Sequence, residues 1–266
     1  MNHDIDTYDL FRRYEGQSWR LCDLPWDRLD PSKAKPEYVR LARSAIMGEC
    51  NSIAAQHGFL NESPTDYAFG AFASLWGFEE LRHHYAFRAW VERLGHPVDD
   101  LPVAASRPPY PAGRTVLATI ATNIISELTV FRVYRDLADE VEEPVLAEIM
   151  RRASADEGRH ASAFTDFARR RLAAHPEELG SLLETLYFYV ADTGKTIKHP
   201  VSVFKSRELG AGSTETIDDG FDYFLSRGSG AEQLRSKIYS VFSALSGFTL
   251  DSPKSVRRAL AEVLAS

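Results

Sequence analysis

A short pattern of charged residues occurs twice in this chain of 266 residues and restricts what it can fold into. Glu79-Glu80-Leu81-Arg82-His83 and Asp156-Glu157-Gly158-Arg159-His160 each place an acid before a Glu-x-x-His sequence and an arginine before the histidine. A Glu and a His three positions apart share one face of an α-helix, so both can reach the same ion. Two such helices side by side can hold a pair of ions.

Each pattern lies on a long apolar stripe with helical spacing. The sequence predicts helices over about residues 36–53, 65–94, 114–139 and 145–174. The first and third stripes each carry one glutamate, Glu49 and Glu127, which precede Glu80 by 31 residues and Glu157 by 30. The chain therefore looks duplicated. In two antiparallel hairpins, with a rise of about 1.5 Å per residue, all four carboxylates would stand near the same height.

Each of the four helices would turn one carboxylate inwards, and two of them would add a histidine. This is the arrangement of ligands in di-iron and di-manganese bundles. Carboxylates and neutral imidazoles suit two divalent ions and leave positions for dioxygen. Isolated ionised carboxylates on apolar stripes would be costly, so bound ions explain them better than chance does. We expect the metal ligands to be Glu49, Glu80, His83, Glu127, Glu157 and His160, with Glu79, Arg82, Asp156 and Arg159 beside them as hydrogen-bonding partners.

Composition indicates the general class of protein and its surroundings. Hydrophobic residues at 44% and charged residues at 26% describe an ordinary globular protein, and the net charge of −7 weighs against a nucleic-acid partner. Two cysteines make no disulfide framework, and we find neither a signal peptide nor an apolar run of membrane-spanning length. We expect a cytoplasmic protein without membrane insertion. We predict one all-α domain over 1–266, with an irregular arm (1–35), a core four-helix bundle (36–175), and additional helices with a long loop (176–266).

The two patterns resemble the signature boxes of the soluble acyl-[acyl carrier protein] desaturases of the ferritin-like di-iron superfamily. The likeness includes Trp76 before the first acidic pair and Trp19 in the arm, and it extends weakly to His199-Pro200. The resemblance implies a ferritin-like bundle with two iron ions in its core, although manganese suits the same ligands. In that family Trp19 and Asp156 would match a proposed electron relay.

The resemblance also implies an activity. The metal centre, with no further catalytic side chain, would use O2 to desaturate an acyl chain held as an acyl carrier protein thioester. Electrons would come from a ferredoxin or a similar donor. A homodimer is plausible for such bundles.

One departure from the family pattern lies beside Glu127. Family members carry a threonine three residues after this glutamate, near the oxygen site, whereas this chain has Val130 there and Thr129 one place earlier. We therefore place Thr129 among the residues beside the ligands. Bulky stripe residues could line a short substrate pocket or simply pack the core. These are Phe72, Trp76, Phe87, Val130, Phe131 and Tyr134.

Two alternatives stay open. A di-iron hydroxylase or N-oxygenase that acts on a secondary-metabolite intermediate would use the same ligands, although N-oxygenases of the aminobenzoate type usually have a third histidine where this chain has Ala153. A non-catalytic helical binding protein could use the metals only to hold its bundle together. Reaction with dioxygen separates this last alternative from the enzymes.

Overall fold

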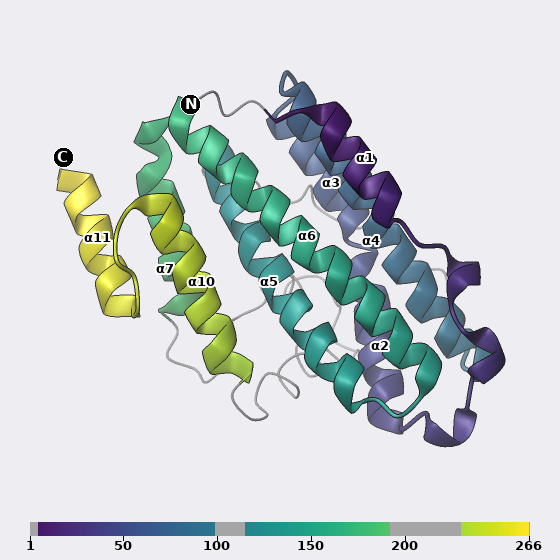
Figure 1. Cartoon of the computed structure of the whole chain (residues 1–266). Coiled ribbons are helices and arrows are strands. Elements are labelled where there is room, and N and C mark those ends of the chain that lie inside the picture. The colour runs from purple at the N-terminus through teal and green to yellow at the C-terminus, as the bar shows by residue number, and fades with distance from the viewer. Residues whose placement is uncertain (1–4, 99–114, 192–229, 266) are drawn as a thin grey trace, which may run out of the picture.

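The structure, a computed structural model, describes residues 5–98, 115–191 and 230–265. Helices account for 84% of these residues and no strand occurs among them, which confirms the all-α prediction. The long helices form a ferritin-like bundle (Figure 1). Its four core members are α2 (Pro36–Glu49), α4 (Tyr67–Arg93), α5 (Val116–Glu140) and α6 (Pro144–Ala174).

Side chains that cap the first turns set where the core helices begin. Asp66 caps α4, Thr115 caps α5 and Glu143 caps α6, each accepting a hydrogen bond from a backbone N–H that has no partner within the helix. Glu143 also accepts a hydrogen bond of 2.6 Å from Nε1 of Trp90, so the cap of α6 ties this helix to α4. The observed boundaries lie close to those predicted from the apolar spacing.

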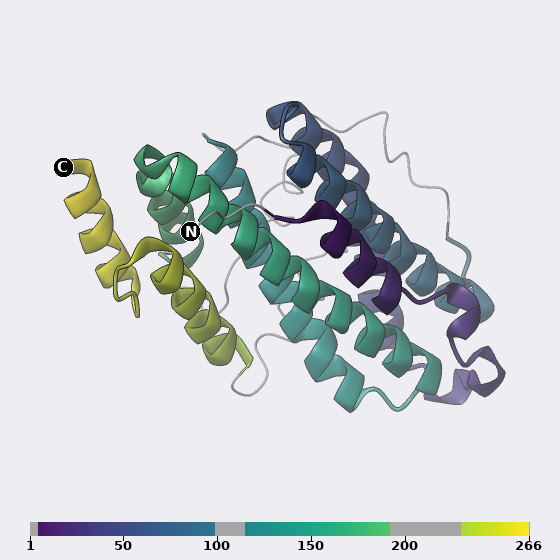
Figure 2. The same ribbon diagram turned by 45° about the horizontal axis from the view of Figure 1, so that its top comes forward.

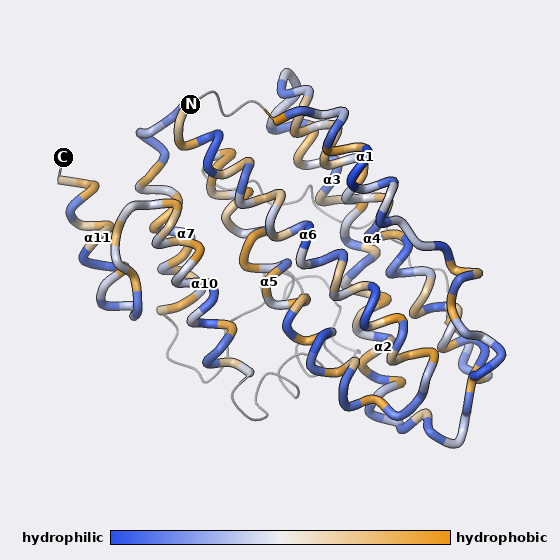
Figure 3. The backbone as a smooth tube through the Cα atoms, in the orientation of Figure 1, coloured by the Kyte–Doolittle hydropathy of each residue, from blue (hydrophilic) through white to orange (hydrophobic). Residues whose placement is uncertain are grey.

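The core helices pack in two pairs. α5 lies along α6, α2 lies along α4, and α4 also contacts α6 (Figures 1 and 2). Hydrophobic and hydrophilic residues alternate along these helices, as expected when only one face of a helix is buried (Figure 3). Aromatic rings fill one end of the interior, where the centroids of Phe72 and Phe164 are 4.8 Å apart and those of Phe69 and Phe167 are 5.2 Å apart.

α5 is long and apolar enough to cross a membrane by length and composition alone. However, 67% of its most apolar window is buried inside the protein, against the other helices of the bundle. A buried core helix passes the same length and composition test as a membrane span. The burial therefore suggests the core helix of a soluble protein.

The prediction of an irregular arm is wrong for part of residues 1–35. α1 (Thr7–Gln17) is a regular helix, capped by Asp6, whose side chain accepts hydrogen bonds from two backbone N–H groups of the first turn. Leu10 and Tyr14, one turn apart, are buried, and α1 packs on α4. The apolar pair and the cap stabilise a helix that the charged composition of the arm had obscured. Three short 3₁₀ turns follow it, at Leu21–Asp23, Trp26–Arg28 and Pro31–Lys33.

The helix predicted over residues 36–53 is also interrupted. α2 ends at Glu49 and α3 (Ser52–Glu62) starts after a tight turn, in which the N–H of Asn51 bonds to the carbonyl of Gly48, three residues back. The turn changes the direction of the apolar stripe, so Ile53 is 43% exposed and does not face the core as predicted. The metal-ligand candidate Glu49 therefore lies at the very end of its helix.

Helices are present, as predicted, in the described part of residues 176–266. α7 (Leu179–Val190) follows the 3₁₀ turn Pro176–Glu178, and α10 (Gly230–Ser246) and α11 (Pro253–Ala265) complete the described part. α7 contacts α5, α10 and α11, and α10 contacts α5 and α6, on the side of the bundle away from α1 (Figure 1). The long loop, predicted from Asp192 to Gly230, falls outside the described residues except for Gly230, which begins α10. That the whole chain is one domain stays a prediction.

Candidate metal centre

The six side chains predicted to bind metal lie together in the core of the bundle. None of them is more than 6% exposed. Each core helix supplies one glutamate and two of the helices add a histidine, because the apolar stripe that faces the interior carries these residues on the same face. α2 contributes Glu49, α4 contributes Glu80 and His83, α5 contributes Glu127, and α6 contributes Glu157 and His160.

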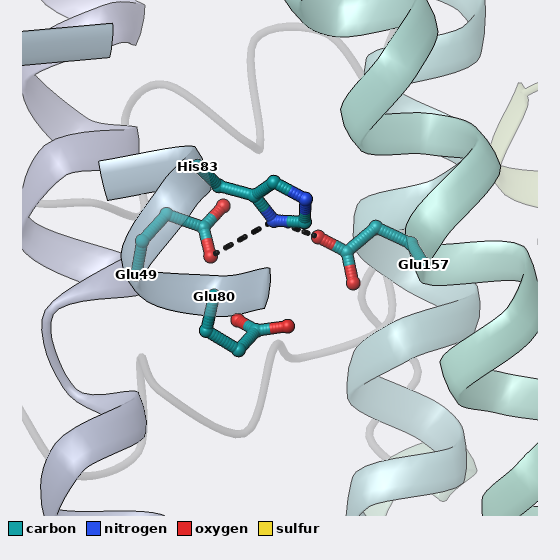
Figure 4. A group of neighbouring side chains, drawn as sticks. All are labelled: Glu49, Glu80, His83 and Glu157. Atoms are coloured by element: carbon teal, nitrogen blue, oxygen red, sulfur yellow. Dashed lines mark ion pairs between the residues drawn. The ribbon is translucent and has the colours of Figure 1, made fainter. Parts of the chain in front are cut away.

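The candidate ligand atoms form two overlapping groups, and within each group they lie within 4.8 Å of one another. Glu80 and Glu157 belong to both groups, so either group can include their carboxylates. Each group then has one glutamate and one histidine of its own, which is the plan of two-metal carboxylate centres. The first group adds Glu49 and His83 to the shared pair (Figure 4), and the second adds Glu127 and His160.

Both histidines turn Nδ1 towards the carboxylates of the cluster. Nδ1 of His83 lies 3.2 Å from Oε1 of Glu157 and 3.9 Å from Oε2 of Glu49 (Figure 4). Nδ1 of His160 lies 3.0 Å from Oε1 of Glu80 and 3.1 Å from Oε2 of Glu157. Nδ1 is therefore the ring nitrogen that each histidine can offer to an ion.

The other ring nitrogen of each histidine contacts the acid of the opposite box. Nε2 of His83 lies 2.9 Å from Oδ2 of Asp156, and Nε2 of His160 lies 2.9 Å from Oε2 of Glu79. Such carboxylate contacts fix the tautomer and the orientation of a metal-binding imidazole. The two boxes thus hold each other's histidines across the interface of α4 and α6.

Two arginines complete this outer layer. Nη2 of Arg82 lies 2.9 Å from Oε1 of Glu79 and 2.9 Å from Oδ2 of Asp156. Nη2 of Arg159 lies 3.0 Å from Oε1 of Glu79 and 2.6 Å from Oδ1 of Asp156. Four of the five residues that were predicted to lie beside the ligands therefore form one network of alternating charge, in which only Arg159 is partly exposed. Hydrogen bonds with the histidines, followed by the charge of Arg159, outweigh burial and lower the pKa of Glu79 and of Asp156.

Burial and mutual repulsion govern the ionisation of the cluster. Burial raises the pKa of Glu80 well above its usual range, and the charges of neighbouring carboxylates raise it further. Burial, followed by the charge of Glu157, likewise raises the pKa of Glu49 and of Glu127. Burial alone would also raise the pKa of Glu157, but hydrogen bonds with the two histidines outweigh it and lower this pKa. Without cations, several of these groups therefore retain protons.

Unpaired atoms at the cluster also fit bound cations. Among the candidate ligands, three buried atoms of the described part make no hydrogen bond of good geometry, namely Oε1 of Glu80, Nδ1 of His83 and Oε1 of Glu157, although each has an atom of another ligand within 3.2 Å. Buried polar atoms without partners are costly, and ions could coordinate these atoms. Carboxylate oxygen with imidazole nitrogen suits iron or manganese, so the residues present fit the implied metal.

Trp19 lies against this network, as the resemblance implied. Its Nε1 donates a hydrogen bond of 2.8 Å to Oδ2 of Asp156. Its ring stacks on His83, with the centroids 6.2 Å apart and the planes inclined by 14°, and the guanidinium of Arg82 lies 4.7 Å from its ring centroid. The contact is present, while electron transfer through it stays a prediction.

Tyr14 is a neighbour of the centre that the sequence did not reveal. Its ring stacks on His160, with the centroids 6.3 Å apart and the planes inclined by 10°, and Arg159 lies 5.6 Å from its ring centroid. This arrangement matches that of Trp19 on His83. The helical spacing of Leu10 and Tyr14 after a capping Asp6 was the available signal.

The residues predicted to line a substrate pocket have several surroundings. Phe72 and Phe87 are fully buried among aromatic rings, which is core packing, and Val130 packs against the core. Phe131 is partly buried, and its ring packs beside Gly158 on α6, at a distance where an added Cβ would make an ordinary contact of 3.4 Å. Whether any of them faces a substrate stays a prediction.

Two more of these pocket candidates, Tyr134 and Trp76, are buried and donate hydrogen bonds to metal-ligand candidates. The sequence did not predict these contacts. Thr129 is buried as well, but its hydroxyl donates to the carbonyl of Ile125 in its own helix, at 2.7 Å. A cavity of about 670 Å³ lies elsewhere, between α1 and α6, and Tyr14 and Arg159 are among the residues that line it.

Comparison with known proteins supports the metal centre. Residues 118–198 match the family model described as Rubrerythrin. The match spans α5, α6 and α7, and so includes Glu127, Glu157 and His160 but not the first half of the ligand set. A search of curated proteins gave no match. The Rubrerythrin match and the buried cluster support a di-iron protein.

Proposed function

We propose that this chain is a dioxygen-dependent di-iron desaturase that acts on an acyl chain carried as an acyl carrier protein thioester. The observation that carries the proposal is that two overlapping groups of candidate ligands lie next to a hydrogen-bonded chain of three residues. In this chain Trp19 contacts Asp156, and Asp156 contacts the candidate ligand His83. This is the juxtaposition that the resemblance to the desaturase boxes implies.

In this proposal the chain holds two ions. Glu80 and Glu157, which belong to both ligand groups, would help to hold both ions, and the glutamate and histidine of each single group would complete the set. Iron, when bound, supplies the redox chemistry with dioxygen. The protein contributes the orientation of both Nδ1 atoms and an interior that excludes water, since the ligands are at most 6% exposed. Four carboxylate charges would match two divalent cations.

The proposed partners follow from the chemistry. Desaturation needs electrons, which a ferredoxin or a similar donor would deliver at the arm. Trp19 contacts Asp156 and Asp156 contacts His83, so an electron that enters at the indole has a short path to a ligand. We also propose an acyl carrier protein as the partner that presents the substrate, and a second copy of the chain as the partner in a homodimer.

Reaction with dioxygen tests the proposal. Iron-loaded protein is reduced without oxygen and then mixed with dioxygen, while its absorbance is followed. We expect a rapid change, and a protein inert to dioxygen would contradict any oxygen-dependent function. Acyl carrier protein thioesters and small aryl amines are then offered in parallel with a ferredoxin and a reductant. Loss of two hydrogens from the acyl chain marks desaturation, whereas gain of an oxygen marks hydroxylation or N-oxygenation and would replace the proposal.

The metal-free protein should lose stability as the pH rises, and the metal-loaded protein should not. Burial raises the pKa of Glu49, Glu80 and Glu127, so the folded state binds more protons than the unfolded state above the ordinary glutamate pKa of 4.5. Hydrogen bonds to carboxylates outweigh burial and raise the pKa of both histidines in the same sense, above 6.5. A group whose pKa is raised in the folded state stabilises the fold fully at a pH below its ordinary pKa. This stabilisation is lost as the pH rises through the folded-state pKa.

Thermal unfolding followed by circular dichroism measures this difference. In the presence of a chelator, the midpoint temperature of unfolding should fall steadily as the pH is raised from about 6 to about 9, a range that extends above the ordinary pKa of histidine. With metal bound, ions take the place of the protons and the profile should be nearly flat. The lowered pKa of Asp156 and of Glu157 acts at the acid end, where stability is lost as the pH falls. A flat profile for the metal-free protein would contradict the ionisation described above.

A further inference from the structure

Glu49 and Glu127 each belong to one ligand group only. Their carboxylates are arranged in the same way but accept hydrogen bonds from different donors. Glu49 turns Oε2 towards the histidine of its group, at 3.9 Å, and its Oε1 accepts a hydrogen bond from the hydroxyl of Tyr134. Glu127 turns Oε2 towards its histidine, at 3.4 Å, and its Oε1 accepts one from Nε1 of Trp76, at 3.3 Å. In each case one carboxylate oxygen faces the centre and the other is held by an aromatic donor.

Tyr134 is fixed in a buried position between two helices. It is fully buried on α5, its ring centroid lies 5.4 Å from that of Phe87, and its hydroxyl reaches α2, where Glu49 stands at the C-terminal end. The hydroxyl of Tyr134 is the donor and the carboxylate of Glu49 is the acceptor of this hydrogen bond. Tyr134 also lies one turn after Val130, where the family threonine is missing.

We propose that Tyr134 is the positioning residue for the ion held by Glu49 and His83. The inference rests on the proposed two-ion centre. A hydrogen bond to Oε1 fixes the rotation of the Glu49 carboxylate and leaves Oε2 as the ligand atom. Glu49 needs this support because its helix ends at the same residue and the chain turns immediately after it. Hydrogen bonds that orient a ligand typically change metal affinity by about 10- to 100-fold.

The test is an anaerobic titration with Mn(II) or Fe(II), in which equilibrium dialysis gives the affinity of each ion. In Tyr134→Phe the ring and its packing stay while the donor is lost. We expect one of the two ions to bind about 10- to 100-fold more weakly and the other to bind as in the unmodified protein. Phe87→Leu is the control, since it disturbs the packing of Tyr134 and leaves its hydroxyl in place. It should leave both affinities within a few fold.

A double-mutant cycle shows whether Tyr134 acts through Glu49. Glu49→Ala removes the proposed ligand and should leave only the ion held with Glu127 and His160. Adding Tyr134→Phe to this variant should then change nothing. Unchanged affinities in Tyr134→Phe, equal weakening of both ions, or a further loss in the Glu49→Ala background would each overturn the inference. An unmodified chain that binds no pair of ions would overturn the proposed function as well.

Discussion

Glu157→Ala should abolish the binding of both ions. Glu157 is one of only two residues that belong to both ligand groups of the described structure, and its two oxygens lie 3.2 Å from Nδ1 of His83 and 3.1 Å from Nδ1 of His160. Its loss removes a ligand from each ion, so each affinity should fall by more than the roughly 100-fold that loss of an outer hydrogen bond can cost. Metal content after dialysis measures the effect.

Two variants show whether this loss is specific. Glu49→Ala removes a residue of one group only and should leave one bound ion per chain. Glu142→Ala removes a glutamate whose side chain is 63% exposed and pairs with Lys35 at the surface, so its metal content should match that of the unmodified protein. If Glu157→Ala retained the same metal content as the unmodified chain, the shared position of this carboxylate would have no role in binding.

Asp156→Ala should lower the free energy of unfolding by about 3–5 kcal/mol, the usual cost of breaking a buried ion pair by removing one partner. Asp156 is 1% exposed and contacts Trp19, His83, Arg82 and Arg159. Alanine would leave a buried indole N–H without its acceptor and two guanidinium groups with one acid in place of two. Urea unfolding of the metal-free protein at neutral pH, followed by circular dichroism, gives the free energy.

Two aspartate variants calibrate this effect. Asp156→Asn keeps the size of the side chain and one acceptor oxygen but loses the charge, so its loss of stability should be smaller than that of alanine. Asp166 lies on the same helix, but its side chain is 50% exposed and pairs with Arg169 at the surface. Asp166→Ala should therefore change the free energy of unfolding by about 1 kcal/mol or less. Equal stability of Asp156→Ala and the unmodified protein would show that the network does not stabilise the fold.

Local spacing determined much of this molecule. Helices need only a repeat of apolar residues along one stretch of chain, and the repeats predicted α4, α5 and α6 closely, and α2 except for its end. The ligand candidates were found in the same way, because Glu80 and His83 share a helix face wherever the helix packs. The arm was missed because its helix depends on a pair of residues, Leu10 and Tyr14, whose burial comes from packing on α4. A short stretch of mixed charge does not reveal that packing.

By itself, then, the sequence determined an all-α bundle, the six candidate ligands and the four charged residues beside them, since all of these follow from position along a helix. Only the tertiary structure decided which residues meet across helices. It paired each histidine with the acid of the opposite box, laid Tyr14 on His160, and brought the hydroxyl of Tyr134 to Glu49, 85 residues away along the chain. Such contacts depend on the rotation and height at which helices pack, and these are set by the whole core, not by any one stretch.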